Sequence, residues 1–207
     1  MTTVCDVMDD LRAMAAVKAA LAEDVGEGDA TTLALVDPAA RATGEILARE
    51  ACRVAGVTVA RAVLTCVDPA LRVAVIVPDG ETVEPGDTIL TIEGKATSIL
   101  TAERTALNFM QRMCGIATLT ARFVKAVEAY GTMILDTRKT TPNLRLFEKY
   151  AVTCGGGTNH RFGLYDRVLV KDNHRRLWQG GDPDRLDLAV AAAREAFPLL
   201  EVEIEVE

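Results

Sequence analysis

A concentration of positive charge distinguishes one stretch of this chain, from Arg138 to Arg176. The stretch holds nine lysines and arginines against three acidic residues, although the 207-residue chain carries a net charge of −7. Three of these cations, Arg138, Lys139 and Lys171, lie at the carboxyl ends of short apolar runs that are typical of buried strands. Four others are expected to be ordinary solvated surface: Arg145, Lys149, Arg175 and Arg176.

The types of these side chains indicate what they could bind. In parallel α/β architectures the carboxyl ends of the strands gather on one face, where active sites form. His160 and Arg161 lie in the loop that leads into the second of these strands, so we expect them at the same face. Arginine forms two parallel hydrogen bonds with a flat carboxylate, and lysine contributes a compact point charge. The cluster therefore predicts a ligand that carries carboxylate, phosphate or both.

The last seven residues, EVEIEVE, supply the opposite charge. A strand of period two places all of their carboxylates on one face: Glu201, Glu203, Glu205 and Glu207. If the strand is parallel, the glutamates near its carboxyl end face the same mouth as Lys171. They could hold a divalent cation through oxygen ligands or stabilise a positively charged transition state. The alternative is the solvated face of an antiparallel edge strand.

Two other functions remain open on these residues. A desolvated Lys139 or Lys171 at a strand end, with arginines nearby to favour the neutral amine, could form a Schiff base as aldolases do. The stretch ETVEPGDTILTIEGKA (81–96) looks like the hairpin of a biotinyl or lipoyl carrier. However, Lys95 lacks the flanking methionines expected of a biotinyl lysine.

The glycine-rich segment CGGGTNHR (154–161) is a weaker signal. Its three glycines allow close backbone approach to a ligand and offer N–H groups. No Gly-Lys-Ser/Thr sequence follows it, which excludes a Walker A loop. No strand–GxGxxG–helix order is present, which excludes a Rossmann fingerprint.

The first half of the chain must position these residues. Helical spacing predicts a helix over 11–23, and alternating or apolar runs separated by turns predict a small sandwich or half-barrel over 42–92. Residues 99–130 read as two helices that meet at Gly115, with a capping signal at Thr101. One face of the first helix is polar, and periodicity alone favours its being solvated; it carries Arg104, Asn108 and Gln111.

The second half alternates strands and helices. MILD (133–136), RVLVKD (167–172) and EVEIEVE read as strands, and helices are predicted over 143–152 and 183–197. This order predicts βαβ units with parallel strands. A parallel strand usually has both faces covered and a neighbour at each edge, so the last strand suggests a chain that stops partway through a barrel. A short edge strand, or an edge completed by a partner chain, is the alternative.

Composition excludes several classes of protein. The acidic balance argues against nucleic acid as a partner, because phosphate binding needs a basic footprint. No run is long enough to span a membrane, and the acidic start of the chain is unlike an export signal. The cysteines are scattered without a C-x-x-C pair, which suits a reducing cytoplasm: Cys5, Cys52, Cys66, Cys114 and Cys154.

Several long motifs in order resemble the quinolinate phosphoribosyltransferase family, also called carboxylating nicotinate-nucleotide pyrophosphorylases. They are LAEDVGEGDATT (21–32), AERTALNFMQRMCGIAT (102–118), LDTRKTTPNLR (135–145), EKYAVTCGGGTNHRFGLYDRVLVKDNH (148–174) and the terminal EVEIEVE. The resemblance implies an α/β fold with an N-terminal α/β sandwich domain, residues 1–115. The first part of an incomplete, TIM-like α/β barrel follows in residues 116–207, apparently truncated at its C-terminus. It also implies a homodimer with a shared active site.

The resemblance also implies roles for single residues. Arg104 matches an arginine donated across the dimer interface to quinolinate, and the other quinolinate-site cations match Arg138, His160, Arg161 and Lys171. Lys139 matches the lysine on the phosphoribosyl pyrophosphate side. Glu205 matches a strand-end glutamate near the ribose and Mg²⁺, with Glu203 as the alternative register. Lys139, Lys171 and Glu205 are thus the expected catalytic residues.

The reaction implied is phosphoribosyl transfer from phosphoribosyl pyrophosphate to quinolinate with decarboxylation, a step of de novo NAD biosynthesis that uses Mg²⁺. The products are nicotinate mononucleotide, pyrophosphate and CO₂. A fragment that is inactive or binds only quinolinate, and a related phosphoribosyltransferase for another base, are the alternatives. Asn143 stands where the family motif commonly has glycine, and asparagine tolerates the same backbone angles.

Overall fold

The computed structural model describes residues 6–178, 182 and 184–206. It divides into two compact units, residues 1–159 and residues 160–207, and each is described by itself. Cys5, Pro183 and Glu207, which entered the predictions above, lie outside the described residues. The division after residue 115 that the sequence suggests stays a prediction.

The first unit begins with a short 3-10 turn, η1 (Val7–Asp9), and two helices, α1 (Leu11–Val25) and α2 (Ala30–Leu35). The Asp10 carboxylate caps α1 by accepting the backbone N–H of Arg12 at 2.8 Å. Gly26, at a φ of 53°, ends it. The helix predicted over 11–23 is therefore confirmed, and it extends two residues further than expected.

A three-stranded antiparallel sheet in the order β1-β5-β3 forms one layer of this unit: β1 (Arg41–Leu47), β5 (Thr88–Lys95) and β3 (Arg72–Val75). Two shorter strands, β2 (Cys52–Arg53) and β4 (Thr82–Val83), pair antiparallel beside it. The strands expected within 42–92 are confirmed.

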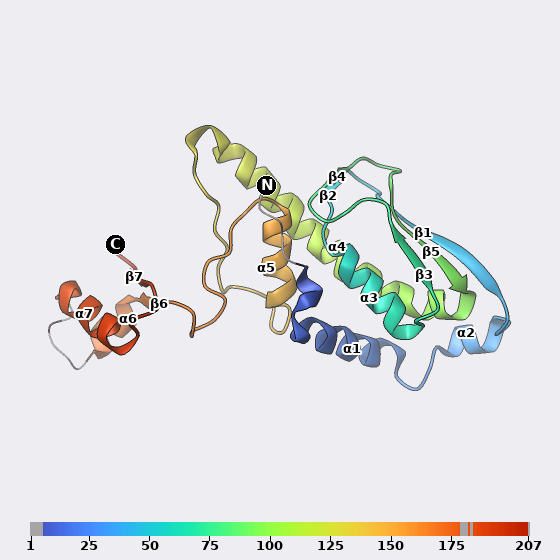
Figure 1. Cartoon of the computed structure of the whole chain (residues 1–207), viewed down its shortest axis with the longest axis horizontal. Coiled ribbons are helices and arrows are strands. Elements are labelled where there is room, and N and C mark those ends of the chain that lie inside the picture. Colours follow the sequence, from blue (N-terminus) through green and yellow to red (C-terminus); the bar gives the residue numbers. More distant parts are fainter. Residues whose placement is uncertain (1–5, 179–181, 183, 207) are drawn as a thin grey trace. The chain divides into compact units, whose positions relative to one another are not determined.

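The structure corrects the expectation of a small sandwich or half-barrel of strands over 42–92, because α3 (Val57–Val67) lies in the middle of this stretch. Its valine-rich sequence has strand propensity, which disguised the helix. Gly56, in the left-handed region at a φ of 95°, starts the helix, and its buried face packs against α4 and α1. Tertiary burial has overridden local propensity here. The result is a mixed α/β layer structure (Figure 1).

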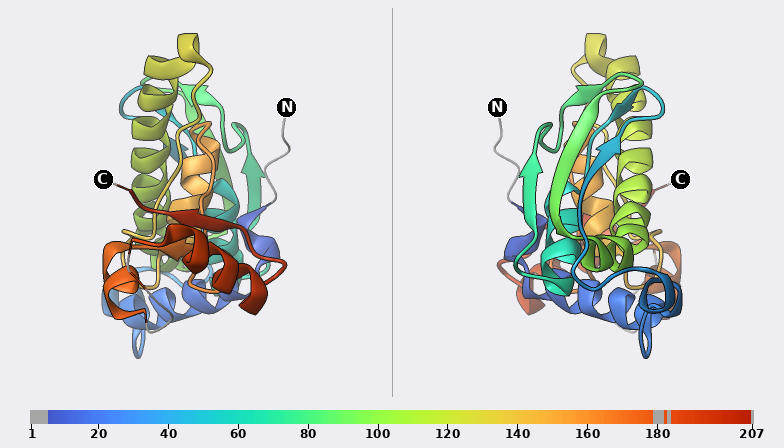
Figure 2. Two further views of the ribbon diagram at one scale, coloured as in Figure 1. Left: turned by 90° about the vertical axis from the view of Figure 1, so that its left-hand side faces the viewer. Right: turned by 90° about the vertical axis from the view of Figure 1, so that its right-hand side faces the viewer.

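α4 (Ala96–Val127) is a single helix of 32 residues that contacts α3, the sheet and α5. Figure 2 shows it running the length of one side of the sheet. The prediction of two helices meeting at Gly115 is therefore wrong, as is a start at Thr101, since the helix begins after Lys95. A glycine costs a helix about 1 kcal/mol, which packing along both sides of it easily outweighs.

The first unit ends in one βα element. Leu135 and Thr158 form a single parallel bridge, and α5 (Arg145–Cys154) connects them. The strand expected at 133–136 is thus only one bridge long, but its parallel pairing is confirmed. α5 packs on α4 and α1, and η2 (Glu128–Tyr130) leads out of α4.

The sequence predicts that the glycines of 154–161 allow a ligand to approach the backbone closely. In the structure, the turn after α5 lies close to α4 instead. A Cβ on Gly155 would lie 2.4 Å from the Ala117 carbonyl oxygen and 2.6 Å from Thr120 Cβ. A Cβ on Gly157 would lie 2.9 Å from Thr120 Cγ2. These two glycines therefore serve packing between the turn and the helix.

The second unit is a βαβ arrangement: β6 (Val168–Val170), α6 (Asp172–Leu177), α7 (Leu186–Ala196) and β7 (Val202–Ile204). β6 and β7 pair in parallel, with Leu169 opposite Glu203. The predicted strands, the predicted helix and their parallel pairing are confirmed, whereas α6 was not foreseen. No closed barrel is formed by the described parts of the chain.

We expect Gly155→Ala to destabilise the protein by about 3 kcal/mol, because its Cβ meets backbone that cannot move alone. Gly115→Ala is the matched control: a Cβ there meets nothing within 4 Å, and alanine should stabilise the helix by up to about 1 kcal/mol. Urea unfolding followed by circular dichroism measures both. Equal effects of the two variants would contradict the packing role of Gly155.

Candidate functional site

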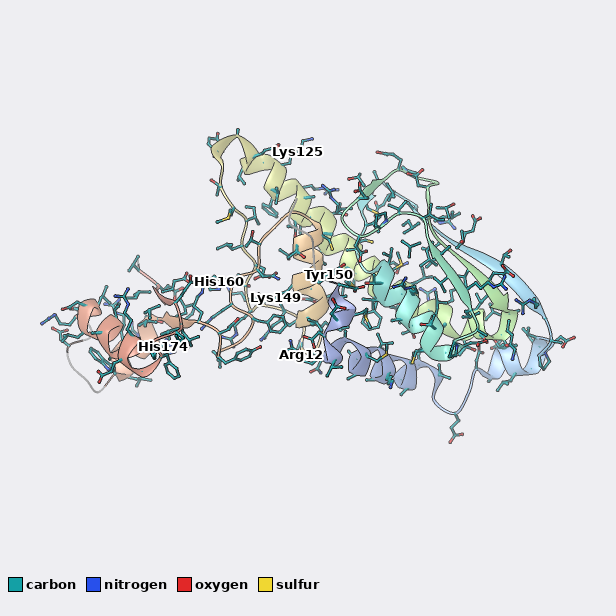
Figure 3. The ribbon with its side chains drawn as sticks, viewed as in Figure 1. Arg12, Lys125, Lys149, Tyr150, His160 and His174 are labelled. Carbon is teal, nitrogen blue, oxygen red and sulfur yellow. The ribbon has the colours of Figure 1, made fainter. Side chains whose placement is uncertain are left out.

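The loop of residues 136–144, named the Arg138 loop below, is anchored at its start by a buried ion pair. Asp136 pairs with Lys149 of α5, and their side chains are only 7% and 1% exposed (Figure 3). The Asn159 amide, with its nitrogen turned towards them, reaches Asp136 Oδ2 at 2.6 Å and the Lys149 carbonyl at 2.9 Å. The expectation that Lys149 is solvated surface is wrong, because its side chain is buried against Asp136. Asp136 lies thirteen residues away in the sequence, so local spacing does not reveal the pair.

A second ion pair holds the far end of the loop. Arg112 of α4 donates through Nε to Glu148 Oε1 at 2.8 Å and also contacts the hydroxyl of Thr141. The backbone N–H of Thr141 donates to Glu148 Oε2 at 3.2 Å. Burial tends to raise the pKa of Glu148, but the hydrogen bonds from Arg112 and Thr141 outweigh it and lower that pKa. Glu148 therefore stays ionised.

Local turns shape the loop between these anchors. The N–H of Lys139 donates to Thr137 Oγ1, and the N–H of Thr140 donates to the Arg138 carbonyl, both at 3.0 Å. Arg145 Nε donates to Thr140 Oγ1 at 3.0 Å, so Arg145 also supports the loop. Asn143 has a φ of 66°, and among the described residues it is the one non-glycine with positive φ. This agrees with the expectation that asparagine stands in for glycine here.

The two cations of the loop remain available to a ligand. Arg138 is half-buried, and its Nε has no hydrogen-bond partner among the described residues. Lys139 is exposed and lines a cavity of about 220 Å³ together with Asp136, Thr137 and Lys149. An unpaired buried donor and an exposed ammonium on a fixed loop form a basis for binding an anion.

In the second unit, His160 and Glu203 lie in contact. His160 Nε2 is 2.6 Å from Glu203 Oε2, and Arg167 reaches the same oxygen at 3.4 Å and pairs with Glu201. The hydrogen bond from His160 is the largest cause of a lowered pKa at Glu203; slight burial opposes it and Arg167 adds to it. The carboxylate of Glu203 is thus held by two side chains near the start of this unit, His160 and Arg167.

Lys171 and Glu205 lie side by side at the carboxyl ends of β6 and β7. Their Nζ and Oε2 atoms are 3.3 Å apart, and the side chains are 42% and 57% exposed. The backbone N–H of Glu205 donates to the Val170 carbonyl at 2.9 Å, which continues the parallel pairing. The N–H of Lys171 donates to Nδ1 of His174 at 2.9 Å. The predicted neighbourhood of a lysine and a glutamate at adjacent strand ends is confirmed.

Arg161 and Arg104 have no carboxylate partner among the ion pairs of the described residues. Arg161 is half-buried in the loop before β6. Arg104 lies exposed on α4 together with Asn108 and Gln111, as the solvated reading of that polar face predicts. The gathering of Arg138 and Lys139 with the cations of the second unit in one pocket stays a prediction.

The structure adds side chains that the sequence did not single out for the site: Arg112, Asp136 and Glu148, with Lys149 in a new role. Nothing in the local pattern separates Arg112 from its solvated neighbours on α4. Only the fold reveals that it meets Glu148, 36 residues further on. The stretch LRLFEKYAV gives the one usable signal, since it sets two adjacent charges, Glu148 and Lys149, among the apolar residues of a mostly buried helix.

No group of three or more metal-ligating side chains occurs in the residues that the structure describes. Mg²⁺ commonly uses only one or two carboxylates, together with waters and the phosphates of its substrate. The exposed carboxylate of Glu205 therefore fits such an ion. In the same described part of the chain, no helix is both long and apolar enough to cross a membrane.

Comparison with known proteins yields two matches to family models. The model described as quinolinate phosphoribosyl transferase, N-terminal domain, matches residues 29–114. The model of the C-terminal domain of the same family matches residues 116–207.

Individual proteins show the same similarity. The chain is 46% identical over 159 residues to quinolinate phosphoribosyltransferase (decarboxylating) 1 of Nicotiana glauca, covering 76% of this chain and 45% of that protein. It is 40% identical over 186 residues to a probable nicotinate-nucleotide pyrophosphorylase (carboxylating) of Synechocystis, covering 89% and 61%. The crystal structure of NadC from Streptococcus pyogenes superposes with a TM-score of 0.87 at 44% identity, covering 93% and 67%. The chain spans about half the length of the curated relatives it matches.

We expect Lys149→Met to destabilise the protein by about 3–5 kcal/mol, because it leaves the Asp136 carboxylate buried without its partner. Adding Asp136→Leu should restore most of this loss, since an apolar pair of similar volume needs no solvation. Urea unfolding of both single variants and the double variant measures the coupling.

The exposed pair Arg41–Glu93, at 3.7 Å, provides the control. Arg41→Met should cost less than about 1 kcal/mol. If the losses of Lys149→Met and Asp136→Leu simply add in the double variant, the two side chains are not coupled, and the anchor role of the pair is wrong.

Proposed function

The chain belongs to the quinolinate phosphoribosyltransferase family, and we propose that it transfers the phosphoribosyl group of phosphoribosyl pyrophosphate to quinolinate with loss of CO₂. The family and the α/β fold class predicted from the motifs are thereby confirmed. The observation that carries the proposed activity is the Arg138 loop. Two ion pairs fix its ends, and Arg138 Nε remains without a partner among the described residues.

Quinolinate is a flat pyridine with two adjacent carboxylates, and each expected cation has a task. Arg138 and Arg161 bind the carboxylates, since a guanidinium matches the geometry of a carboxylate. His160 and Lys171 complete the cationic surroundings of the base. Lys139 binds the phosphates of phosphoribosyl pyrophosphate. Support comes from the family motifs and from the absence of carboxylate partners at Arg138 and Arg161 among the described ion pairs.

The reaction follows from holding these two substrates together. The pyridine nitrogen attacks the anomeric carbon of the ribose, and the bond from that carbon to pyrophosphate breaks. Positive charge develops on the ribose, and the nearby carboxylate of Glu205 stabilises it. The ribosylated nitrogen is cationic, so it stabilises the carbanion left when the C2 carboxylate departs as CO₂. That carbanion takes a proton to give nicotinate mononucleotide. Positioning of nitrogen against carbon supplies much of the acceleration.

Mg²⁺ supplies charge neutralisation for the pyrophosphate oxygens when it is bound. Glu205 would hold it, as an exposed carboxylate that its partner Lys171 does not cover. Glu203 is the less suitable ligand, because His160 and Arg167 already occupy its Oε2 atom. This favours Glu205 in the choice of register that the sequence left open.

A homodimer with a shared site is part of the proposal. Arg104 lies exposed on α4 and could be donated to the site of a second copy. We further propose that the protein works in the cytoplasm, and the free thiols of Cys52, Cys66, Cys114 and Cys154 support a reducing compartment.

Removal of the carboxylate-binding arginines tests the base site. Arg138→Ala and Arg161→Ala should each weaken quinolinate binding by about 10–100-fold, because each loses a charge-assisted hydrogen-bond pair of about 1.5–3 kcal/mol. Calorimetric titration of quinolinate, and mass-spectrometric detection of nicotinate mononucleotide with both substrates and Mg²⁺, provide the readouts. Arg72→Ala, an exposed arginine on β3, is the control that should change neither. Unchanged affinity in both site variants would reject the assignment, and binding without product in the unaltered chain would reject the proposed activity.

Mixing two inactive variants tests the shared site. Arg104→Ala and Lys171→Ala should each abolish activity alone. A mixed dimer of the two contains one site with both residues intact, so activity should return to about a quarter of the unaltered level after statistical exchange. Native mass spectrometry establishes that the subunits have exchanged. Proven exchange without recovered activity would show that Arg104 acts within its own subunit or not at all.

A further inference from the structure

A second cationic cavity lies in the first unit, away from the Arg138 loop. Its volume is about 520 Å³, and it is bounded by β2 and β4, the C-terminal half of α4 and the turn at Gly155–Gly156. It shares no lining residue with the cavity beside Lys139. Lys125, one of its lining residues, is labelled near the end of α4 in Figure 3. Nothing in the proposed reaction uses this cavity.

Positive charge dominates its lining. Arg53 of β2 and Arg122 and Lys125 of α4 face one acidic residue, Glu128. None of the three cations takes part in an ion pair among the described residues. Three cations against one carboxylate, with none of the three in a described ion pair, create a potential in the cavity that favours an anion.

Arg53 gives an independent sign of a missing ligand. Its Nη1 donates to the Gly80 carbonyl at 2.5 Å, and its backbone N–H donates to Thr118 Oγ1 at 2.9 Å, so its position is fixed. Its Nε, however, is buried and has no partner in the described structure. A buried donor left unpaired is energetically unfavourable, and a bound acceptor would remove that cost. Among the described residues, one other arginine has a buried Nε without a hydrogen-bond partner: Arg138, which belongs to the proposed substrate site.

We propose that this cavity is a binding site for a phosphate-bearing small molecule. Guanidinium groups match phosphate oxygens in pairs, and an ammonium adds a point charge, so two arginines and a lysine suit a group of charge −2 or more. Thr82, which carries a hydroxyl group, also lines the cavity. The volume lies within the roughly 300–1,000 Å³ of small-molecule sites and exceeds what a single phosphate fills. The ligand is therefore a diphosphate or a phosphate ester.

A ligand in this cavity would contact the turn that leads into the bridge beside the Arg138 loop, so its binding would be coupled to the proposed substrate site. Gly155 packs on α4, and two residues after Gly156 the chain enters the bridge between Thr158 and Leu135. The Arg138 loop starts directly after Leu135. An anion that joins β2, α4 and this turn thus stabilises the segment from which the loop is built.

Inorganic pyrophosphate is the probe for this site, and it must be kept from the proposed substrate site. Titration is therefore done calorimetrically, without Mg²⁺, on the full chain carrying Lys139→Ala and Lys171→Ala. Adding Arg122→Gln and Lys125→Gln should weaken the remaining binding at least tenfold, because two of three cations are lost. Both side chains are exposed, so folding is expected to survive. Adding Lys18→Gln and Arg61→Gln instead removes the same charge from exposed helix positions and should change affinity less than twofold.

Hydrogen exchange gives the position of binding. Pyrophosphate should slow amide exchange in residues 118–128 and 155–157 of the Lys139→Ala, Lys171→Ala protein. Equal losses of affinity in the two charge-matched variants, no detectable binding to the starting protein, or protection confined to other segments would each overturn the proposal. Inorganic phosphate, titrated in parallel, should bind more weakly than pyrophosphate if the cavity takes a larger anion.

Discussion

The ion pair between Asp136 and Lys149 is the constraint on which the Arg138 loop depends. Both side chains are withdrawn from water, and each charge would be costly there alone. Replacing such a pair by apolar residues is often neutral for stability, so its value lies in geometry. An apolar pair can slide, whereas a carboxylate and an ammonium with defined hydrogen bonds fix one position. Asp136 is thereby held at the end of the single parallel bridge, and the two cations that follow start from a fixed point.

α4 connects the Arg138 loop to the rest of the first unit. Its 32 residues contact the sheet, α3 and α5, so it links the strands of the first half to the loop of the second. Arg112 on its surface reaches Glu148 and Thr141, which fixes the far end of the loop. Gly155 presses the following turn against the same helix. A break at Gly115 would have uncoupled these contacts, so the proposed site depends on the continuity of α4.

The sequence predicted most of the elements, and it failed where burial overrides local pattern. α3 was missed because its valines favour a strand, and Lys149 was misplaced because charged residues are rarely buried. The neighbouring positions of Lys171 and Glu205 were predicted correctly, since parallel pairing and a period of two leave little freedom. Arg112 was missed because a salt bridge between distant segments leaves no trace in local spacing.

Three glutamates lie in β7 or directly beside its ends, and they differ in their surroundings: Glu201, Glu203 and Glu205. Period two gives them the same direction, yet each meets a different partner. Glu201 pairs with Arg167, Glu203 is held by His160 and Arg167, and Glu205 faces Lys171 at the carboxyl end of the neighbouring strand. Glu201 and Glu203 therefore contact side chains from the start of the second unit, Arg167 and His160. Only Glu205 combines an exposed carboxylate with a position at the carboxyl end of a parallel strand, where the active sites of α/β folds form.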